Sequence, residues 1–309
     1  MTDLSIIIPF LNESENISSL FKVINDYWAK HDLNVEVIFV DDGSNDNSVE
    51  ILSSQKCRSV KAKLVKLSKN YGSHNALRAG IQFAEGKYIG FTYADLQDPI
   101  ELQLKMYKEA VAHKANIIWG MREESSSKFL EKAFSKWYAS LMKKFVDPKF
   151  PNKNFDIVLF DEKVKHQVNA NIEANSSIFL QILSLGYKQR TVNYIKKERV
   201  KGKSKWTFAK KVKLFIDSFV AFSYFPIKLV SNVGLIFFII GILWTIYIVS
   251  RQLIFNDLAT GWPALVSILM IGFGVTNIGI GIVAEYLWRT LDATRKRPVF
   301  IIEKITTLN

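Results

Sequence analysis

Residues 93–99 read Tyr93-Ala94-Asp95-Leu96-Gln97-Asp98-Pro99 and follow an apolar run at residues 88–92. The run predicts a buried strand that ends in oxygen-bearing side chains and is stopped by a proline. Open α/β sheets bind ligands at the carboxyl ends of their strands. Carboxylate and amide oxygens are hard ligands that suit Mg²⁺ or Mn²⁺. We therefore expect a divalent cation that carries a diphosphate at this strand end.

The first half of the chain alternates between strand-like and helix-like patterns. Strands are predicted at residues 5–10, 35–40, 64–67, 88–92 and 115–119, and helices at 15–30, 47–54, 73–85 and 100–113. Further strands are predicted at 155–160 and 187–194, around a helix at 177–185. This alternation indicates an α/β domain, with a Rossmann-like, mostly parallel sheet covered by helices on both faces.

Two apolar segments near the C-terminus carry no charged residue, at about 229–250 and 262–284. Each is long enough to cross a ~30 Å hydrocarbon core as a helix. They predict a transmembrane hairpin, and the glycines of the second segment allow close helix packing.

Charge supports a membrane location. The net charge is +12, and basic residues cluster at 196–213 and 289–297, on either side of the hairpin. Both ends of the hairpin are therefore expected in the cytoplasm. Residues 203–224 combine aromatic and lysine residues, which suits a helix in the headgroup layer, although a solvated helix packed on the soluble domain is the alternative. No nucleic-acid-binding motif is present, and the single cysteine excludes an intrachain disulfide.

These patterns divide the chain into four parts. We expect a cytoplasmic catalytic domain at 1–200, a juxtamembrane amphipathic helix at 201–226, two transmembrane helices within 227–288, and a cytoplasmic C-terminal tail at 289–309.

Polar side chains also follow the first two predicted strands. The first strand end offers Pro9, Asn12 and Glu13, and the second offers Asp41, Asp42, Ser44 and Asp46. Carboxylates at these positions are placed to accept N–H and O–H groups of a base and a ribose. Taken alone, Asp-Asp-Gly-Ser is also typical of a turn with an N-cap.

The combined pattern resembles the family 2 glycosyltransferases of the GT-A fold. It resembles more narrowly the polyprenyl-phosphate glycosyltransferases, which include bacterial GtrB-type, ArnC-type and dolichol-phosphate mannose synthase-type enzymes. The matching stretches are residues 8–13, 40–44, 70–72, 94–99, 120–122 and 199–206, together with 285–289 at the end of the hairpin.

The resemblance implies roles for individual residues. Pro9, Asn12, Glu13, Asp41, Asp42 and Ser44 would bind the uridine part of a UDP-sugar, with Lys69 and Asn70 at the rim of the donor pocket, and Asp95 and Gln97 would ligate the cation; Arg122, Arg199, Ser204 and Lys205 would bind the phosphate of the lipid acceptor. For Lys69 and Asn70 a structural turn is the alternative, and for Arg199 an interfacial anchor.

Catalysis by such enzymes inverts the anomeric carbon and needs little proton removal, because a polyprenyl phosphate is already an anionic nucleophile. Asp95 would act through the cation. Asp156 aligns with a carboxylate on the acceptor side, as base or positioning group, and Asp161 is its competitor.

The chain departs from the family pattern at three places. Tyr93 replaces the first carboxylate of the usual Asp-Ala-Asp, Ser125 stands in place of a second arginine, and Val158 replaces an arginine after Asp156. These changes put metal affinity, donor choice and acceptor handling in question.

We therefore expect a multi-pass protein of the bacterial inner membrane that moves a hexose, with glucose favoured, from a UDP-sugar to undecaprenyl phosphate for cell-surface glycan modification. N-acetylhexosamine and galactose stay open as donors. Expected partners are the bilayer, a homo-oligomer, and a flippase and downstream transferase. The competing hypothesis is a catalytically degenerate membrane scaffold or nucleotide-sugar-binding partner of a flippase. A processive polysaccharide synthase would need more membrane helices and a Gln-x-x-Arg-Trp stretch, which the sequence lacks.

Overall fold

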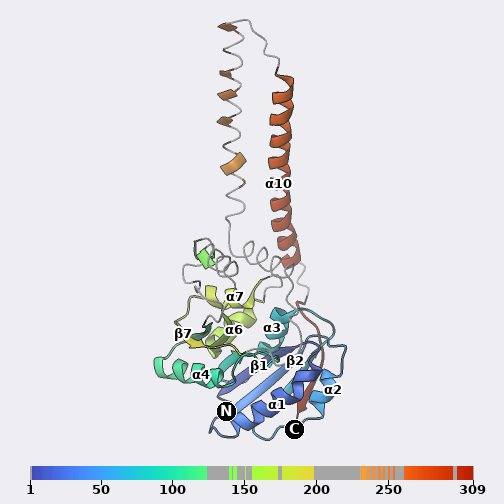
Figure 1. The fold of residues 1–309 in the computed structure, drawn as a ribbon, viewed down its shortest axis with the longest axis vertical. Coiled ribbons are helices and arrows are strands. Elements are labelled where there is room, and N and C mark those ends of the chain that lie inside the picture. Colours follow the sequence, from blue (N-terminus) through green and yellow to red (C-terminus); the bar gives the residue numbers. More distant parts are fainter. Residues whose placement is uncertain are drawn as a thin grey trace. The chain divides into compact units, whose positions relative to one another are not determined.

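The protein is represented by a computed structural model, shown in Figure 1. It describes residues 2–123, 155–172, 176–197, 261–294 and 298–308, with scattered positions between 139 and 150 and between 230 and 254. The chain forms two compact units: Met1–Ser218 together with Pro298–Asn309, and Phe219–Arg297.

The first unit is built on one sheet. Among the described residues its strands are β1 (Leu4–Phe10), β2 (Val35–Asp41), β3 (Lys61–Leu67), β4 (Tyr88–Phe91), β5 (Ile117–Arg122), β6 (Phe155–Asp161), β7 (Gln189–Tyr194) and β8 (Ile302–Leu308). Their order is β7-β5-β6-β4-β1-β2-β3-β8. Strand β1 pairs in parallel with β2 and β4, as do β2 with β3 and β5 with β7. Strand β6 is antiparallel to β4 and β5, and β8 is antiparallel to β3. The predicted α/β sheet is confirmed, and its mixed character comes from β6 and β8.

Helices cover both faces of the sheet. The described helices of this unit are α1 (Ser14–Trp28), α2 (Ser48–Ser53), α3 (Ser73–Phe83), α4 (Glu101–His113), α6 (Glu162–Ala170) and α7 (Ile178–Ser184). Alternate residues of β1 point to opposite faces. Ile6 and Ile8 belong to a buried cluster with apolar residues of α1 and α4, whereas Ile7 lies against Gly80 of α3. Every residue of β1 and β2 is buried, as expected for inner strands covered on both sides.

Strand β8 was not predicted. Residues 289–309 were expected to form a tail, but Ile302–Leu308 completes the sheet edge beside β3, with Lys66 and Glu303 joined by an ion pair of 3.0 Å. The strand is short, and most of its residues are exposed, so it carries no apolar run that would reveal it.

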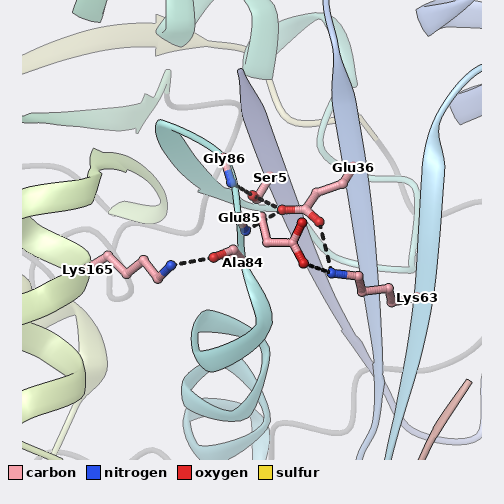
Figure 2. Close-up of polar contacts among 7 residues, drawn as sticks. All are labelled: Ser5, Glu36, Lys63, Ala84, Glu85, Gly86 and Lys165. Atoms are coloured by element: carbon pink, nitrogen blue, oxygen red, sulfur yellow. Dashed lines mark hydrogen bonds and ion pairs between the residues drawn. The ribbon is translucent and has the colours of Figure 1, made fainter. Parts of the chain in front are cut away.

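A polar cluster lies at the amino edge of the sheet, as Figure 2 shows. The carboxylate of Glu36, 1% exposed, accepts the Ser5 hydroxyl and the backbone N–H of Glu85, both at 2.5 Å. Lys63 lies 3.5 Å from Glu36 and 2.5 Å from Glu85. The Ser5 hydroxyl in turn accepts the N–H of Gly86, at 2.7 Å. These contacts fasten the turn between α3 and β4 to the first two strands.

In the second unit, helix α10 (Trp262–Thr294) extends beyond the predicted segment 262–284. Within it, residues 271–288 are long and apolar enough to cross a membrane, and none of that stretch is buried within the described structure. Ten of the 22 residues 229–250 and all of residues 201–226 lie outside the described residues, so the predicted first membrane helix and the amphipathic helix stay predictions.

Candidate active site

The carboxyl ends of β1, β2 and β4 meet at one edge of the sheet. Phe10 is the register partner of Asp41, and the N–H of Asp42 donates to the Phe10 carbonyl at 2.9 Å. Strand β4 pairs with β1 only as far as Ile7, so Pro9 lies where the β4 ladder has ended and no donor is needed on that side. The three loops that follow these strands carry most of the predicted donor-site residues.

The first two loops are fastened to each other by hydrogen bonds. Asn12, with φ 50°, donates its N–H to the Ser44 hydroxyl at 2.9 Å, and its side-chain oxygen accepts the N–H of Asn45 at 2.8 Å. The N–H of Glu13 donates to the Ser48 hydroxyl at 2.8 Å. Asn12, Glu13 and Ser44, predicted from separate motifs, are thus brought together.

Asp46 makes the same connection from the second loop. Its carboxylate accepts the N–H groups of Ser14 at 3.1 Å and Ser48 at 3.0 Å. Burial works to raise the pKa of Asp46, but these hydrogen bonds outweigh it and hold the pKa below the ordinary value. Asp46 is therefore an ionised structural link.

Asp41 is fully buried and only partly satisfied. Its Oδ1 accepts the N–H of Ser44 at 2.9 Å, while its Oδ2 is buried without a hydrogen-bond partner among the described residues. Burial is the main cause that raises the pKa of Asp41 above its ordinary value, against the opposing effects of Ser44 and Lys66. An unsatisfied buried acceptor is costly, so Oδ2 is suited to a donor N–H or O–H from a ligand.

Asp42 has a different position. Its two oxygens accept the N–H groups of Tyr71 at 2.7 Å and Gly72 at 3.0 Å, so the carboxylate holds the loop after β3. Gly43, with φ 75°, lies against this loop, and a Cβ there would come within 2.5 Å of the Lys69 carbonyl carbon. Asp41 and Asp42 therefore bind different partners, a difference that the sequence alone did not predict.

Lys69 and Asn70 are exposed on that loop. The Lys69 ammonium lies 5.2 Å from the centre of the Tyr71 ring, and the side chain of Asn70 accepts the N–H of Gly72 at 3.0 Å. Asn70 therefore supports the turn, and its exposure also leaves the loop accessible to a ligand.

Asp95 and Gln97 stand on a tight turn after β4. Both are half-buried, the Oδ1 of Asp95 accepts the N–H of Gln97 at 3.2 Å, and Leu96 between them has φ 58°. The described residues contain no group of three or more histidine, cysteine or acidic side chains that is arranged to hold a metal ion by itself. One carboxylate and one amide oxygen fit Mg²⁺ or Mn²⁺ that takes its other ligands from water and a diphosphate. Tyr93, in place of the family's first carboxylate, packs against the apolar core.

The predicted acceptor residues are described only in part. Arg122 is half-buried at the carboxyl end of β5. Arg199, Ser204, Lys205 and Ser125 lie outside the described residues.

Asp156 and Asp161 lie at opposite ends of antiparallel β6. Asp156 stands in the irregular stretch beside Gly120 and Met121, at the edge of the candidate site, although only its backbone is described. Asp161 pairs with Tyr88 at the far edge and its carboxylate accepts the N–H of Val164, where it caps α6.

His74 was not singled out from the sequence. It lies in the first turn of α3 with its Nδ1 buried and without a hydrogen-bond partner among the described residues, 5.6 Å from the Phe179 ring between ring centres. Burial, assisted by Arg78, lowers its pKa to about 4, so the ring is neutral near pH 7. Its only signal in the sequence is its place after the Gly72 turn.

The chain is similar to known proteins along most of its length. Glycosyl transferase family 2 matches residues 5–169. The bactoprenol glucosyl transferase derived from the SfII prophage of Shigella flexneri is 30% identical, with 97% of each chain covered. The uncharacterized glycosyltransferase YkcC of Bacillus subtilis is 30% identical, with 97% of this chain and 93% of that protein covered.

Solved structures are more distant. Glucosyl-3-phosphoglycerate synthase from Mycobacterium tuberculosis, in complex with Mn²⁺, UDP and phosphoglyceric acid, is 13% identical over 71% of this chain and 76% of that chain, with a TM-score of 0.49. The family match and the full-length relatives confirm the resemblance drawn from the sequence: the chain belongs to glycosyl transferase family 2 and is a glycosyltransferase.

Proposed function

We propose that this glycosyltransferase moves a hexose, with glucose favoured, from a UDP-sugar to undecaprenyl phosphate at the cytoplasmic face of a bacterial membrane. The observation that carries the proposal is the meeting, at one sheet edge, of a buried unsatisfied acceptor on Asp41 and the oxygen-bearing turn of Asp95 and Gln97. The full-length relatives named bactoprenol glucosyl transferases support the lipid acceptor and the sugar.

On the donor side, Oδ2 of Asp41 would accept an N–H of the uracil base. Asn12, Glu13 and Ser44 hold the surrounding loops in place before the nucleotide arrives, which reduces the ordering cost of binding. Asp95 and Gln97 would hold Mg²⁺ or Mn²⁺, which supplies stabilisation of the negative charge on the UDP leaving group.

On the acceptor side, a phosphate oxygen of the lipid would attack the anomeric carbon as the bond to the UDP oxygen breaks, in one inverting displacement. Arg122, with Arg199, Ser204 and Lys205, would hold that phosphate by charge-assisted hydrogen bonds. Asp156 would position the acceptor from the neighbouring strand, because its backbone lies at the same edge of the sheet as Arg122.

Three observations support attachment to a membrane by a two-helix hairpin. Residues 271–288 are apolar and unburied. A Cβ built on Gly279 of α10 would come within 3.0 Å of Val230, so the two apolar segments approach each other. The described chain leaves the sheet after the carboxyl end of β7 and returns at Ile302, the partner of Leu67 at the carboxyl end of β3. Both connections therefore start from the edge that carries the candidate site.

The proposal is tested by a donor panel. Purified full-length protein in detergent or nanodiscs is incubated with undecaprenyl phosphate, Mn²⁺ or Mg²⁺, and UDP-glucose, UDP-galactose or UDP-N-acetylglucosamine, and the lipid product is identified by mass. We expect a hexosyl phospholipid, formed best from UDP-glucose. No product from any donor, with UDP binding intact, would instead favour a nucleotide-sugar-binding scaffold. Assembly as a homo-oligomer, and handover of the product to a flippase and a downstream transferase, remain part of the proposal.

A further inference from the structure

Asp98 contacts residues outside its turn, whereas the Asp95 side chain accepts a hydrogen bond from within it. Its side chain is almost fully buried, and its Oδ1 accepts the Tyr194 hydroxyl at 3.0 Å and lies 3.6 Å from the Lys196 ammonium. Tyr194 is 6% exposed, and the side chain of Lys196 is 12% exposed. A buried, hydrogen-bonded ion pair holds its partners firmly, because removing one group leaves an uncompensated buried charge.

The same turn makes a second connection to the end of β7. The N–H of Lys197 donates to the carbonyl oxygen of Gln97 at 2.8 Å. The turn that carries Asp95 and Gln97 is therefore bonded to the residues that follow β7 both through side chains and through the backbone.

The backbone of Tyr194 also pairs with the strand end that carries Arg122. It is the register partner of Arg122 on β5, and its carbonyl accepts the N–H of Glu123 at 2.8 Å. One residue thus binds the donor-side turn with its hydroxyl and the Arg122 strand end with its main chain.

We propose that Tyr194, through Asp98 and Lys196, is a positioning residue that couples the two substrate sites, so that a bound nucleotide and cation raise the affinity for the anionic lipid acceptor. The inference rests on the proposed function. A ligand that fixes the turn of Gln97 also fixes the strand end of Arg122, and the acceptor then binds a site whose ordering cost has already been met. Such coupling is reciprocal, so the acceptor raises the affinity for UDP by the same factor.

The test measures binding rather than turnover. Full-length protein in nanodiscs is titrated with a short-chain polyprenyl phosphate, with and without saturating UDP and Mn²⁺, and the ratio of the two dissociation constants gives the coupling. We expect UDP and Mn²⁺ to tighten acceptor binding by roughly 5-fold or more in the wild-type protein. Tyr194→Phe should lower the ratio toward one while UDP·Mn²⁺ affinity alone is kept, because the ion pair of Lys196 and the backbone bond of Lys197 remain. Lys196→Gln should reduce the ratio in the same direction.

Tyr187→Phe is the matched control, since it removes a hydroxyl just before the other end of the same strand, and it should keep the wild-type ratio. A wild-type ratio of one, with both ligands binding, would overturn the coupling and leave the proposed function standing. A Tyr194→Phe ratio equal to that of the wild type would also overturn it. Absence of UDP·Mn²⁺ binding by the wild-type protein would instead contradict the proposed function, and the coupling with it.

Discussion

Strand β2 carries a buried carboxylate near each end, and the two have different surroundings. At the amino edge, Glu36 is 1% exposed, accepts two hydrogen bonds and faces the Lys63 ammonium (Figure 2). At the carboxyl edge, Asp41 is 0% exposed, accepts one N–H from Ser44, and has its Oδ2 buried without a hydrogen-bond partner among the described residues. Oε2 of Glu36 also lacks a hydrogen-bond partner among the described residues, but it lies 3.5 Å from the Lys63 ammonium. Burial alone therefore does not distinguish a structural carboxylate from the one that we propose binds a ligand, and the neighbouring ammonium group does.

Strand β6 repeats this contrast between the edges. Asp161 caps a helix at the far edge and accepts the side-chain amide of Asn116 at 2.6 Å, whereas Asp156 stands at the edge of the candidate site. The pair therefore allows the two edges to be compared on a second strand, with the same residue type at both positions.

Among the variants that compare the two edges of the sheet, the largest effect is expected on β6. Asp156→Asn should lower turnover by roughly 100-fold, because it removes the carboxylate that we place beside the acceptor, and UDP affinity should not change. Sugar transfer and UDP titration measure the two. Asp161→Asn is the matched control: asparagine caps a helix about as well as aspartate does, so this variant should keep both the fold and the turnover of the wild type. Unchanged turnover in Asp156→Asn would remove Asp156 from the mechanism.

The second effect concerns stability at the amino edge. Glu36→Gln should lower the free energy of unfolding by about 2 kcal/mol, because the buried carboxylate loses its charge beside Lys63. Thermal or denaturant unfolding of the purified protein measures it. Glu85→Gln alters the same cluster at a side chain that is 64% exposed, so its effect should stay within about 0.5 kcal/mol. If Glu36→Gln instead weakened UDP binding without loss of stability, the contrast between the edges would be wrong.

The third effect concerns ligand binding at Asp41. Asp41→Asn should weaken UDP by about 10-fold, because the amide presents a donor where the base requires an acceptor. The stability of the unligated protein should be unchanged or slightly higher, since a buried charge is removed. Calorimetric titration and thermal unfolding measure these changes, and loss of stability with full UDP affinity would contradict the assignment.

The pH dependence of UDP affinity gives an independent test of the role that we propose for Asp41. Burial raises its pKa above the ordinary value of 3.8, so it takes up a proton earlier on acidification than an exposed aspartate does. UDP affinity should therefore start to fall at a pH above that value, and this part of the fall should be absent in Asp41→Asn. In the unligated protein the sign is opposite: the contribution of Asp41 to stability is present below the pKa of the unfolded chain and is lost as pH rises through its raised folded pKa.

The smallest effect is expected at Ser44. Ser44→Ala removes the acceptor of the Asn12 N–H and should weaken UDP by about 3-fold, since the loop is less well ordered before binding. Ser54→Ala, which removes an exposed hydroxyl bonded to the Ile51 carbonyl, is the control and should bind UDP as the wild type does. Equal affinity in both variants would exclude preorganisation by Ser44.

Most of the fold was predictable because its inner strands are short apolar runs between amphipathic helices. Strand β8 was not, because its exposed, mixed residues give no periodic signal. Helix α6 was also missed, although Asp161 and Glu162 are typical of a helix start.

For the candidate site, the sequence predicted the edge of the sheet at which the residues lie, but not the residues that they contact. Sequence motifs placed Asp41, Asp42, Asp95 and Asp98 at strand ends, which the structure has. That Asp42 holds the Tyr71 loop and Asp98 binds Tyr194 depends on contacts between segments far apart in the chain, for which a single sequence gives no signal.

The central claim is that Asp95 and a divalent cation at the carboxyl edge activate a UDP-sugar for transfer to a lipid phosphate. It is tested most directly by measuring transfer from the preferred UDP-sugar to undecaprenyl phosphate, with Mn²⁺ and with excess chelator, in the wild type and in Asp95→Asn. We predict cation-dependent transfer in the wild type and a loss of roughly 1,000-fold in Asp95→Asn, as several kcal/mol of charge stabilisation requires. Equal transfer by the two proteins, or full transfer in chelator, would contradict the claim.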